Sequence, residues 1–113
     1  MEILDKIITI DDLKNLSAKL FGDLVKAVVD VERELVAIDA ELHSDLEALL
    51  IENGSKQKDL WGINFYPHLE GNDFIEFDSM INLRPSHSNM SRGVDDKKNQ
   101  QRIIEVVNKW VKR

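Results

Sequence analysis

The chain has 113 residues, of which 42% are hydrophobic and 32% charged, with a net charge of −6 and no cysteine. This length and composition predict a single folded domain over residues 1–113. The lack of cysteine excludes disulfides, thiolate metal sites and a thiol nucleophile, and the acidic balance disfavours generic binding to duplex nucleic acid. We expect a cytoplasmic protein with no membrane partner, because the sequence shows no signal peptide and no apolar run near the ~20 residues of a membrane span.

The first half of the chain predicts a helix followed by a β-hairpin. Residues 3–9 are a short apolar stretch, and Thr9 suits the N-cap of a helix whose leucines follow at helical spacing. Gly22 suits the C-terminal cap of this helix. Alternating β-branched residues then predict strands over residues 24–31 and 35–39, joined by a tight turn.

The second half predicts another helix, another hairpin and a final helix. Ser44 and Glu47 have the spacing of a capping box at the start of the second helix. Residues 60–66 and 74–83 predict the third and fourth strands, because a turn-rich connection joins them. Residues 95–112 predict the last helix, which has an apolar stripe and a basic end.

The elements follow in the order (β)αββαββα. Both pairs of adjacent strands are joined by loops too short for a crossover connection, which predicts a mainly antiparallel sheet of four strands. The apolar stretch at residues 3–9 is compatible with a fifth, N-terminal edge strand. The sequence therefore predicts an α+β fold in which three helices cover one face of the sheet.

Alternation along the third and fourth strands places polar side chains on one face of the sheet. If the hairpin is centred on Glu70, Asn64 lies opposite Glu76 and Gly62 opposite Asp78. Gly62 would leave room beside Asp78 for a ligand or another chain. Asn and Asp are depleted in strands, so this face is either a binding surface or the solvated face of a one-sided sheet.

The loop from Arg84 to Arg92 is the one stretch of this acidic chain that suits an anion. It contains two arginines, three serines, an asparagine and a histidine, and no acidic residue. It leads toward a helix N-terminus, where exposed amides favour negative charge, and arginine can form bidentate contacts to carboxylate or phosphate. The alternative is an ordinary surface loop in which Arg84 pairs with Asp78 or a nearby glutamate. The candidate ligand-binding residues of the sheet face and the loop are Asn64, Asp78, Asn82, Arg84, Asn89 and Arg92.

Acidic residues and a histidine also cluster between residues 39 and 47. His43 and Glu47 would share one face of a helix that began before them. A histidine with neighbouring carboxylates can bind a divalent metal ion or act as acid and base. The alternative is structural, because a capping box with Ser44 would explain Glu47. The candidate catalytic residues are His43, Glu41 and Glu47, and the candidate metal ligands are Asp39, Glu41 and His43.

Five strings in the sequence form a distinctive set: Glu41–His43, Gly54–Ser55, Asp59–Pro67, Phe77–Pro85 and Asn89–Arg92. They resemble a family of small uncharacterised prokaryotic proteins, a domain of unknown function. The resemblance covers residues 25 to about 94 and implies no activity. It implies that the matching polar positions belong to a shared pattern, namely Glu41, His43, Asp59, Asn64, Asp78, Ser79, Asn82, Arg84 and Asn89.

Three functions remain open from the sequence. The first is a binding module for a small polar or anionic ligand, in which Asn64 and Asn82 supply amide hydrogen bonds and Arg84 supplies charge. The second is a hydrolase or nuclease, with or without a metal ion, that uses His43 and nearby carboxylates. The third is a structural homo-oligomer, such as a homodimer, whose self-association covers open sheet edges. The sequence assigns no cofactor.

Overall fold

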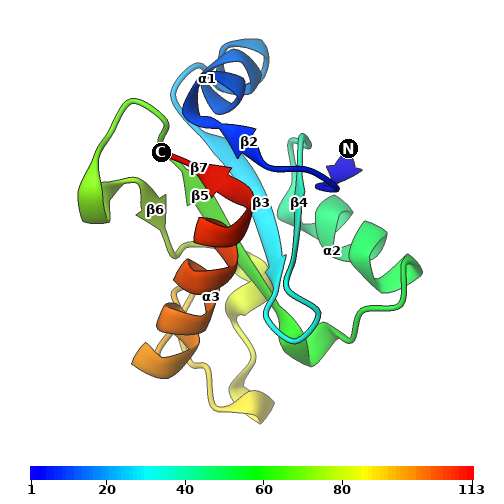
Figure 1. Cartoon of the computed structure of the whole chain (residues 1–113). Helices are drawn as coiled ribbons and strands as arrows, with labels where there is room; N and C mark the ends of the chain where they lie inside the picture. Colours follow the sequence, from blue (N-terminus) through cyan, green and yellow to red (C-terminus); the bar gives the residue numbers. More distant parts are fainter.

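The computed structural model describes residues 1–113 (Figure 1). Its helices are α1 (Ile10–Lys19), α2 (His43–Glu52) and α3 (Lys97–Trp110). Its strands are β1 (Glu2–Ile3), β2 (Ile8–Thr9), β3 (Val25–Asp30), β4 (Leu35–Ile38), β5 (Leu60–Phe65), β6 (Ile75–Glu76) and β7 (Val111–Lys112). Short 3₁₀ helices are η1 (Gln57–Asp59), η2 (Gly71–Asp73), η3 (Met80–Asn82) and η4 (Pro85–His87). None of the helices combines the length and apolar composition that crossing a membrane requires.

The main sheet has five antiparallel strands in the order β1-β4-β3-β5-β6. This arrangement confirms the α+β fold, both hairpins and the N-terminal edge strand. Asn64 lies opposite Glu76, as the hairpin register predicts. The sequence did not indicate the second sheet, in which β2 and β7 pair in parallel.

The helices cover both faces of the main sheet, so the expectation that they cover one face was wrong. α1 and α3 pack on one face, over a cluster that includes Val29 and Ile63, while α2 packs on the other, over Val28 and Leu60 (Figure 1). The reason lies in β3 and β5. These central strands carry buried residues on both faces, and a strand that is apolar on both sides needs a covering layer on each.

The fourth strand is much shorter than residues 74–83. β6 ends at Glu76, and the chain then leaves the sheet and turns into η3. Ser79 starts this turn, because its hydroxyl accepts a hydrogen bond from the N–H of Ile81 at 3.3 Å. The predicted pairing of Gly62 with Asp78 is therefore wrong, and the ladder between β5 and β6 contains two residue pairs.

Helix ends agree with the sequence at some positions and differ at others. Thr9 caps α1 in a reciprocal capping box with Asp12, as predicted. The C-cap residue is Leu20 and not Gly22. Gly22 follows two residues later with a φ of 88°, a left-handed conformation that suits glycine. α3 is shorter than expected: the Asp96 side chain caps its start, and Val111 leaves the helix to pair with β2.

The start of α2 also differs from the prediction. Its N-cap is Leu42, and no side chain caps its first turn. The capping box of Ser44 and Glu47 does not form, because the helix begins at His43 and so already includes Ser44. Glu47 consequently lies one turn after His43 on the same helix face.

Candidate functional site

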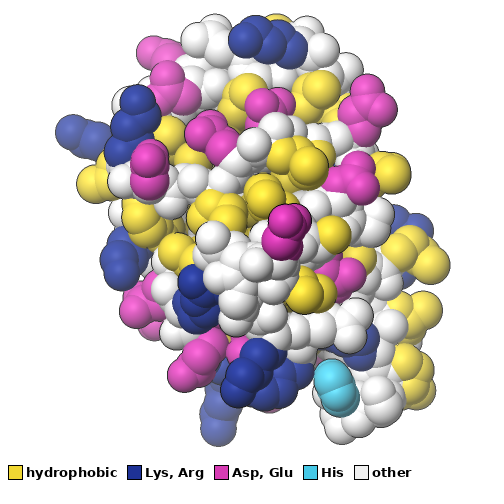
Figure 2. Space-filling model, turned by 90° about the vertical axis from the view of Figure 1, so that its right-hand side faces the viewer, with side chains coloured by type: hydrophobic (Ala, Val, Ile, Leu, Met, Phe, Trp, Pro, Cys, Tyr) yellow, Lys and Arg dark blue, Asp and Glu magenta, His cyan; other side chains and the backbone are white.

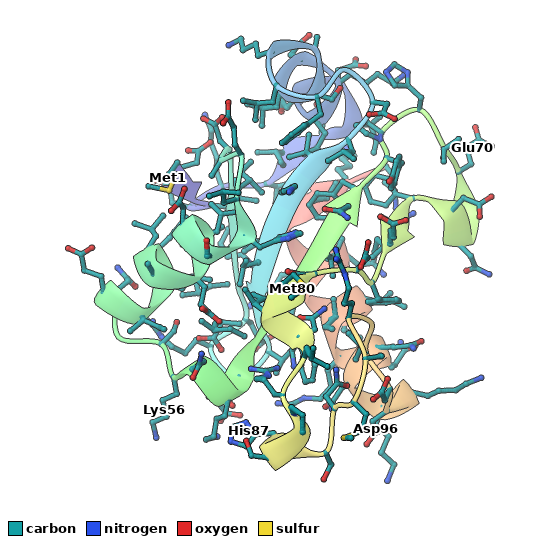
Figure 3. All side chains as sticks on the ribbon, turned by 180° about the vertical axis from the view of Figure 1, so that it is seen from behind. Met1, Lys56, Glu70, Met80, His87 and Asp96 are labelled. Atoms are coloured by element: carbon teal, nitrogen blue, oxygen red, sulfur yellow. The ribbon has the colours of Figure 1, made fainter.

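A small cavity of about 160 Å³ lies between the first turn of α2 and η3. It opens on the α2 face of the sheet, beyond the apolar cluster that the helix covers. Figure 3 shows Met80 in the middle of this face, between α2 and the loop that carries His87. The residues that line the cavity are Lys26, Leu42, His43, Ser44, Ser79, Met80, Ile81 and Arg92.

His43 is the buried polar group of this cavity, with 8% of its surface exposed. Its Nε2 donates a hydrogen bond to the carbonyl oxygen of Ile63 at 2.8 Å, which leaves Nδ1 as an acceptor in the neutral ring. Burial lowers the pKa of His43, and the charge of Lys26 adds to this, against opposing effects of Ile63, Asp78 and Asn64. The ring is therefore neutral at pH 7.

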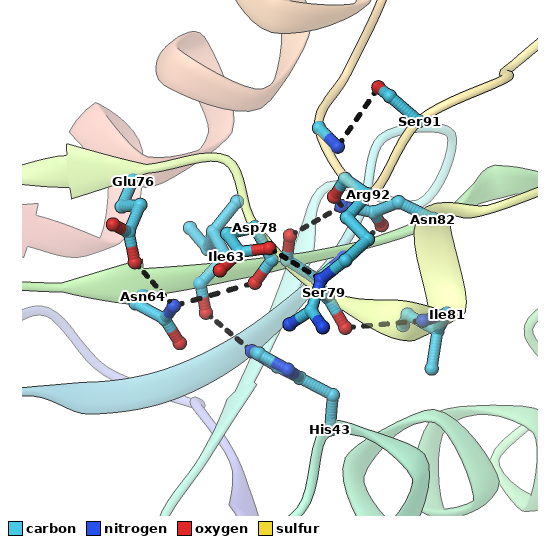
Figure 4. Close-up of polar contacts among 12 residues, drawn as sticks. His43, Ile63, Asn64, Glu76, Asp78, Ser79, Ile81, Asn82, Ser91 and Arg92 are labelled. Carbon is cyan, nitrogen blue, oxygen red and sulfur yellow. Dashed lines mark hydrogen bonds and ion pairs between the residues drawn. The ribbon is translucent and has the colours of Figure 1, made fainter.

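Arg92 supplies positive charge next to this histidine. Its Nε donates to Oδ1 of Asp78 at 2.8 Å, in an ion pair whose side chains are 56% and 43% exposed. Figure 4 shows the guanidinium group turned toward the His43 ring. The two terminal nitrogens of Arg92 donate to no acceptor of the chain, so they are free to contact a ligand.

Two further features make the cavity electropositive in a chain of net charge −6. Lys26 lines it from β3, with its amino group 5.3 Å from the centre of the exposed Phe21 ring. The first turn of α2 has no side-chain cap, and free amides at a helix N-terminus attract negative charge. Asp45 is the one acidic residue of that turn, and it is exposed.

Asn82, a predicted ligand contact, instead completes the sheet. Its side chain is fully buried. Its Oδ1 accepts from the N–H of Gly62 at 2.8 Å, and its Nδ2 donates to the carbonyl of Gly62 at 2.9 Å and to that of Arg92 at 3.0 Å. The amide thus takes the place of a strand backbone beside β5, where β6 has already ended.

Asn89 has a similar role in the loop after η4. The two N–H groups of its Nδ2 are shared among the carbonyls of Asn82, Ser91 and Gly93, and its Oδ1 accepts from the N–H of Asp95. The side chain is 3% exposed. All its hydrogen-bonding groups are used within the chain, so it fixes the loop and has nothing left for a ligand.

Arg84 is buried away from the cavity. Its guanidinium lies 4.3 Å from the centre of the Trp61 ring, and its Nη1 donates to the carbonyl of Gln57. Burial lowers the pKa of Arg84, while the charges of Glu47 and Asp59 oppose this. Asp78 pairs with Arg92, so the pairing of Arg84 with Asp78 that the sequence allowed does not form. The glutamate near Arg84 is Glu47.

The remaining polar residues of the sheet face form a short network at its outer end. The Nδ2 of Asn64 donates to Oε1 of Glu76 at 2.8 Å, and the Tyr66 hydroxyl donates to the same oxygen at 3.1 Å. Burial and the neighbouring Glu76 raise the pKa of Tyr66. The Oδ1 of Asn64 is buried and has no partner.

A scan against protein families matches residues 2–110 to the family described as Protein of unknown function (DUF5674). The chain belongs to this family. The match confirms the resemblance to a domain of unknown function and extends it over nearly the whole chain. A search of curated proteins and a search of solved structures each gave no match.

In this family member the acidic segment does not assemble into a metal centre. No group of three or more His, Asp or Glu side chains is placed to hold an ion. Asp39 follows β4 with a φ of 73°, and Glu41 is exposed. Glu47 lies near Arg84 with one carboxylate oxygen buried and unpartnered. Burial raises the pKa of Glu47, against the effects of Gln57 and Arg84.

Six residues that line the cavity were not among the candidate site residues, namely Lys26, Leu42, Ser44, Ser79, Met80 and Ile81. Lys26 is one of two charged residues in a strand otherwise made of valine and alanine, which was a usable signal. Leu42 and Met80 form the apolar rim and are more than half exposed. The exposure of Leu42 could not be read from the sequence, because its spacing to Leu46 also suits the buried stripe of a helix.

Proposed function

We propose that this protein is a binding module for a small anionic ligand, held in the cavity between the first turn of α2 and η3. The observation that carries the proposal is the convergence there of Lys26, Arg92 and His43 at a helix start without a side-chain cap. Arginine and lysine are the usual partners of carboxylate and phosphate. Their convergence supports an anion although the chain as a whole is acidic.

The size of the cavity limits what it holds. Sites for whole drug-sized ligands have volumes of roughly 300–1,000 Å³, whereas this cavity measures about 160 Å³. It suits a single charged group, such as a carboxylate or a phosphate. Any larger remainder of the ligand would lie outside, on the surface around Leu42 and Met80.

Thermal unfolding in inorganic phosphate tests the proposal, with sodium chloride of equal ionic strength as reference. Ligand at ten times its Kd stabilises the folded state by roughly 1.4 kcal/mol, which raises Tm by about 4–8 °C for a domain near this size. Arg92→Gln should remove this shift. It should change the stability of the free protein little, because an exposed ion pair contributes about 0–1 kcal/mol.

A matched control separates a site from general charge. Lys98→Gln removes one positive charge from an exposed position on α3, so it should leave the phosphate shift intact. Equal loss of the shift in Lys98→Gln and Arg92→Gln, or no shift in the unmodified protein with either phosphate or acetate, contradicts the proposal.

His43 supports a second candidate function, that of a general base in a hydrolase. The ring is neutral at pH 7, a backbone carbonyl orients it, and Nδ1 is unpartnered, which is the state a base requires. Nitrophenyl esters of phosphate and acetate are suitable probes. Activity that His43→Asn abolishes would support the enzyme, and the absence of any such activity would leave the binding role.

We also propose, from the sequence and its open sheet edges, a cytoplasmic protein that self-associates. Light scattering at several concentrations tests the association. A strict monomer at all concentrations contradicts it.

A further inference from the structure

Exposed apolar side chains surround the cationic cavity. Leu42 and Met80 line it with exposures of 54% and 62%, and Ile81 lies beside them, half-buried. Two more exposed apolar side chains, Leu83 and Met90, follow on the segment after η3. Figure 2 shows hydrophobic side chains across the middle of the α2 side of the molecule and again at its right-hand edge. Exposed apolar side chains at the rim of a polar cavity are typical of an interaction site.

We propose that this cavity binds the C-terminal residue of a peptide or protein whose last side chain is apolar. The inference rests on the proposed function and specifies its ligand. The terminal carboxylate would contact Arg92 and Lys26 at the start of α2. The last side chain would lie against Leu42 and Met80.

The third contact, at Nδ1 of His43, distinguishes a peptide C-terminus from other anions that carry an apolar group. His43 is more than nine-tenths buried, lines the cavity, and has an Nδ1 with no hydrogen-bond partner in the chain. In the neutral ring this atom accepts a hydrogen bond. The last residue of a peptide has an amide N–H beside its carboxylate, whereas a fatty acid at neutral pH has no hydrogen-bond donor in that place.

The three features of the cavity therefore match the three groups of a C-terminal residue. Positive charge matches the carboxylate, an unpartnered acceptor matches the amide N–H, and an apolar rim matches the side chain. Capture of a C-terminal carboxylate by main-chain amides is an established mode of peptide recognition. The volume of about 160 Å³ fits an end group and leaves the rest of the partner outside.

Fluorescence anisotropy with short labelled peptides tests the inference. The probe is a glycine-serine peptide that ends in leucine with a free carboxylate. Two matched peptides differ at one group each: one has an amidated C-terminus and one ends in aspartate. We expect the free leucine peptide to bind, and each matched peptide to bind at least about tenfold more weakly, which is the effect of losing ~1.4 kcal/mol.

Variants of the exposed residues link the binding to this cavity. Arg92→Gln and Met80→Ser should each weaken binding of the leucine peptide, and Lys98→Gln should leave its affinity unchanged. N-acetyl-leucine should displace the peptide, whereas octanoate, which has the carboxylate and an apolar tail but no N–H, should displace it poorly.

Each other outcome decides against the inference. Equal binding of the amidated or aspartate peptide, or equal competition by octanoate, overturns it. A phosphate-dependent Tm shift without any peptide binding overturns this inference and leaves the anion site. The absence of both overturns the proposed function as well.

Discussion

Asn82→Ala is the substitution that most directly tests how this fold ends its sheet. It removes an amide that serves three backbone groups: the N–H and carbonyl of Gly62 and the carbonyl of Arg92. The site is fully buried. In the variant these groups lose their partner. Strand β6 cannot replace the lost amide, because it ends six residues earlier, at Glu76.

The structure gives the expected size of the loss. A buried polar group left without its partner costs about 1–3 kcal/mol. Three such groups would cost about 3–9 kcal/mol, and a water that enters the space of the lost amide can satisfy some of them. We therefore expect a loss of about 3–5 kcal/mol, a large part of the ~5–15 kcal/mol that stabilises a typical domain.

Urea unfolding followed by the fluorescence of Trp61 and Trp110 measures this loss. The midpoint should fall while the dependence on urea stays unchanged. Asn72→Ala is the matched control, because Asn72 is exposed in η2 and surface substitutions change stability by less than about 0.5 kcal/mol. A loss below about 1 kcal/mol for Asn82→Ala would refute the reasoning, since ~1 kcal/mol is the least that one unsatisfied buried group costs.

Two further predictions concern neighbours of this amide and of the cavity. Gly62→Ala should destabilise the protein strongly in urea unfolding, because a Cβ there would lie 2.5 Å from the Cβ of Ser79; adding Ser79→Gly should recover part of the loss, and no recovery would contradict the geometry. Burial lowers the pKa of His43 in the folded state, so the unfolded chain binds the proton first as pH falls. Stability from this group is complete above an unfolded pKa near 6.5 and declines as pH falls through the lower folded-state pKa. His43→Gln should flatten that decline in urea midpoints measured from about pH 7.5 downward, and an unchanged slope would contradict it.

Local signals in the sequence predicted much of the fold. Thr9 marks the start of α1 because cap chemistry depends on neighbours along the chain. The register of Asn64 with Glu76 followed from alternation and the position of the turn. These features need no knowledge of distant contacts, and each was confirmed.

The errors share a physical cause. Polar and apolar residues continue to alternate after Glu76, which predicted a longer strand. In the structure the backbone of β5 at Gly62 instead bonds to the side chain of Asn82. An amide side chain carries the same donor and acceptor as a peptide group, so it can replace a strand without a strand pattern. Asn89 was predicted to contact a ligand for the same reason. Its side-chain amide instead bonds to backbone groups of its own loop.

Spare hydrogen-bonding capacity therefore separates the polar residues of this protein into two groups. Asn82 and Asn89 use every donor and acceptor within the chain. Arg92 and His43 each keep a group free at the cavity, and only free groups can recognise another molecule. Substitutions in the first pair should lower the stability of the free protein, and substitutions of Arg92 should lower ligand-induced stabilisation instead. The reverse pattern would be an Asn82→Ala variant that is stable but no longer binds the ligand. That result would place the binding site at the sheet edge beside Asn82 and contradict the cavity.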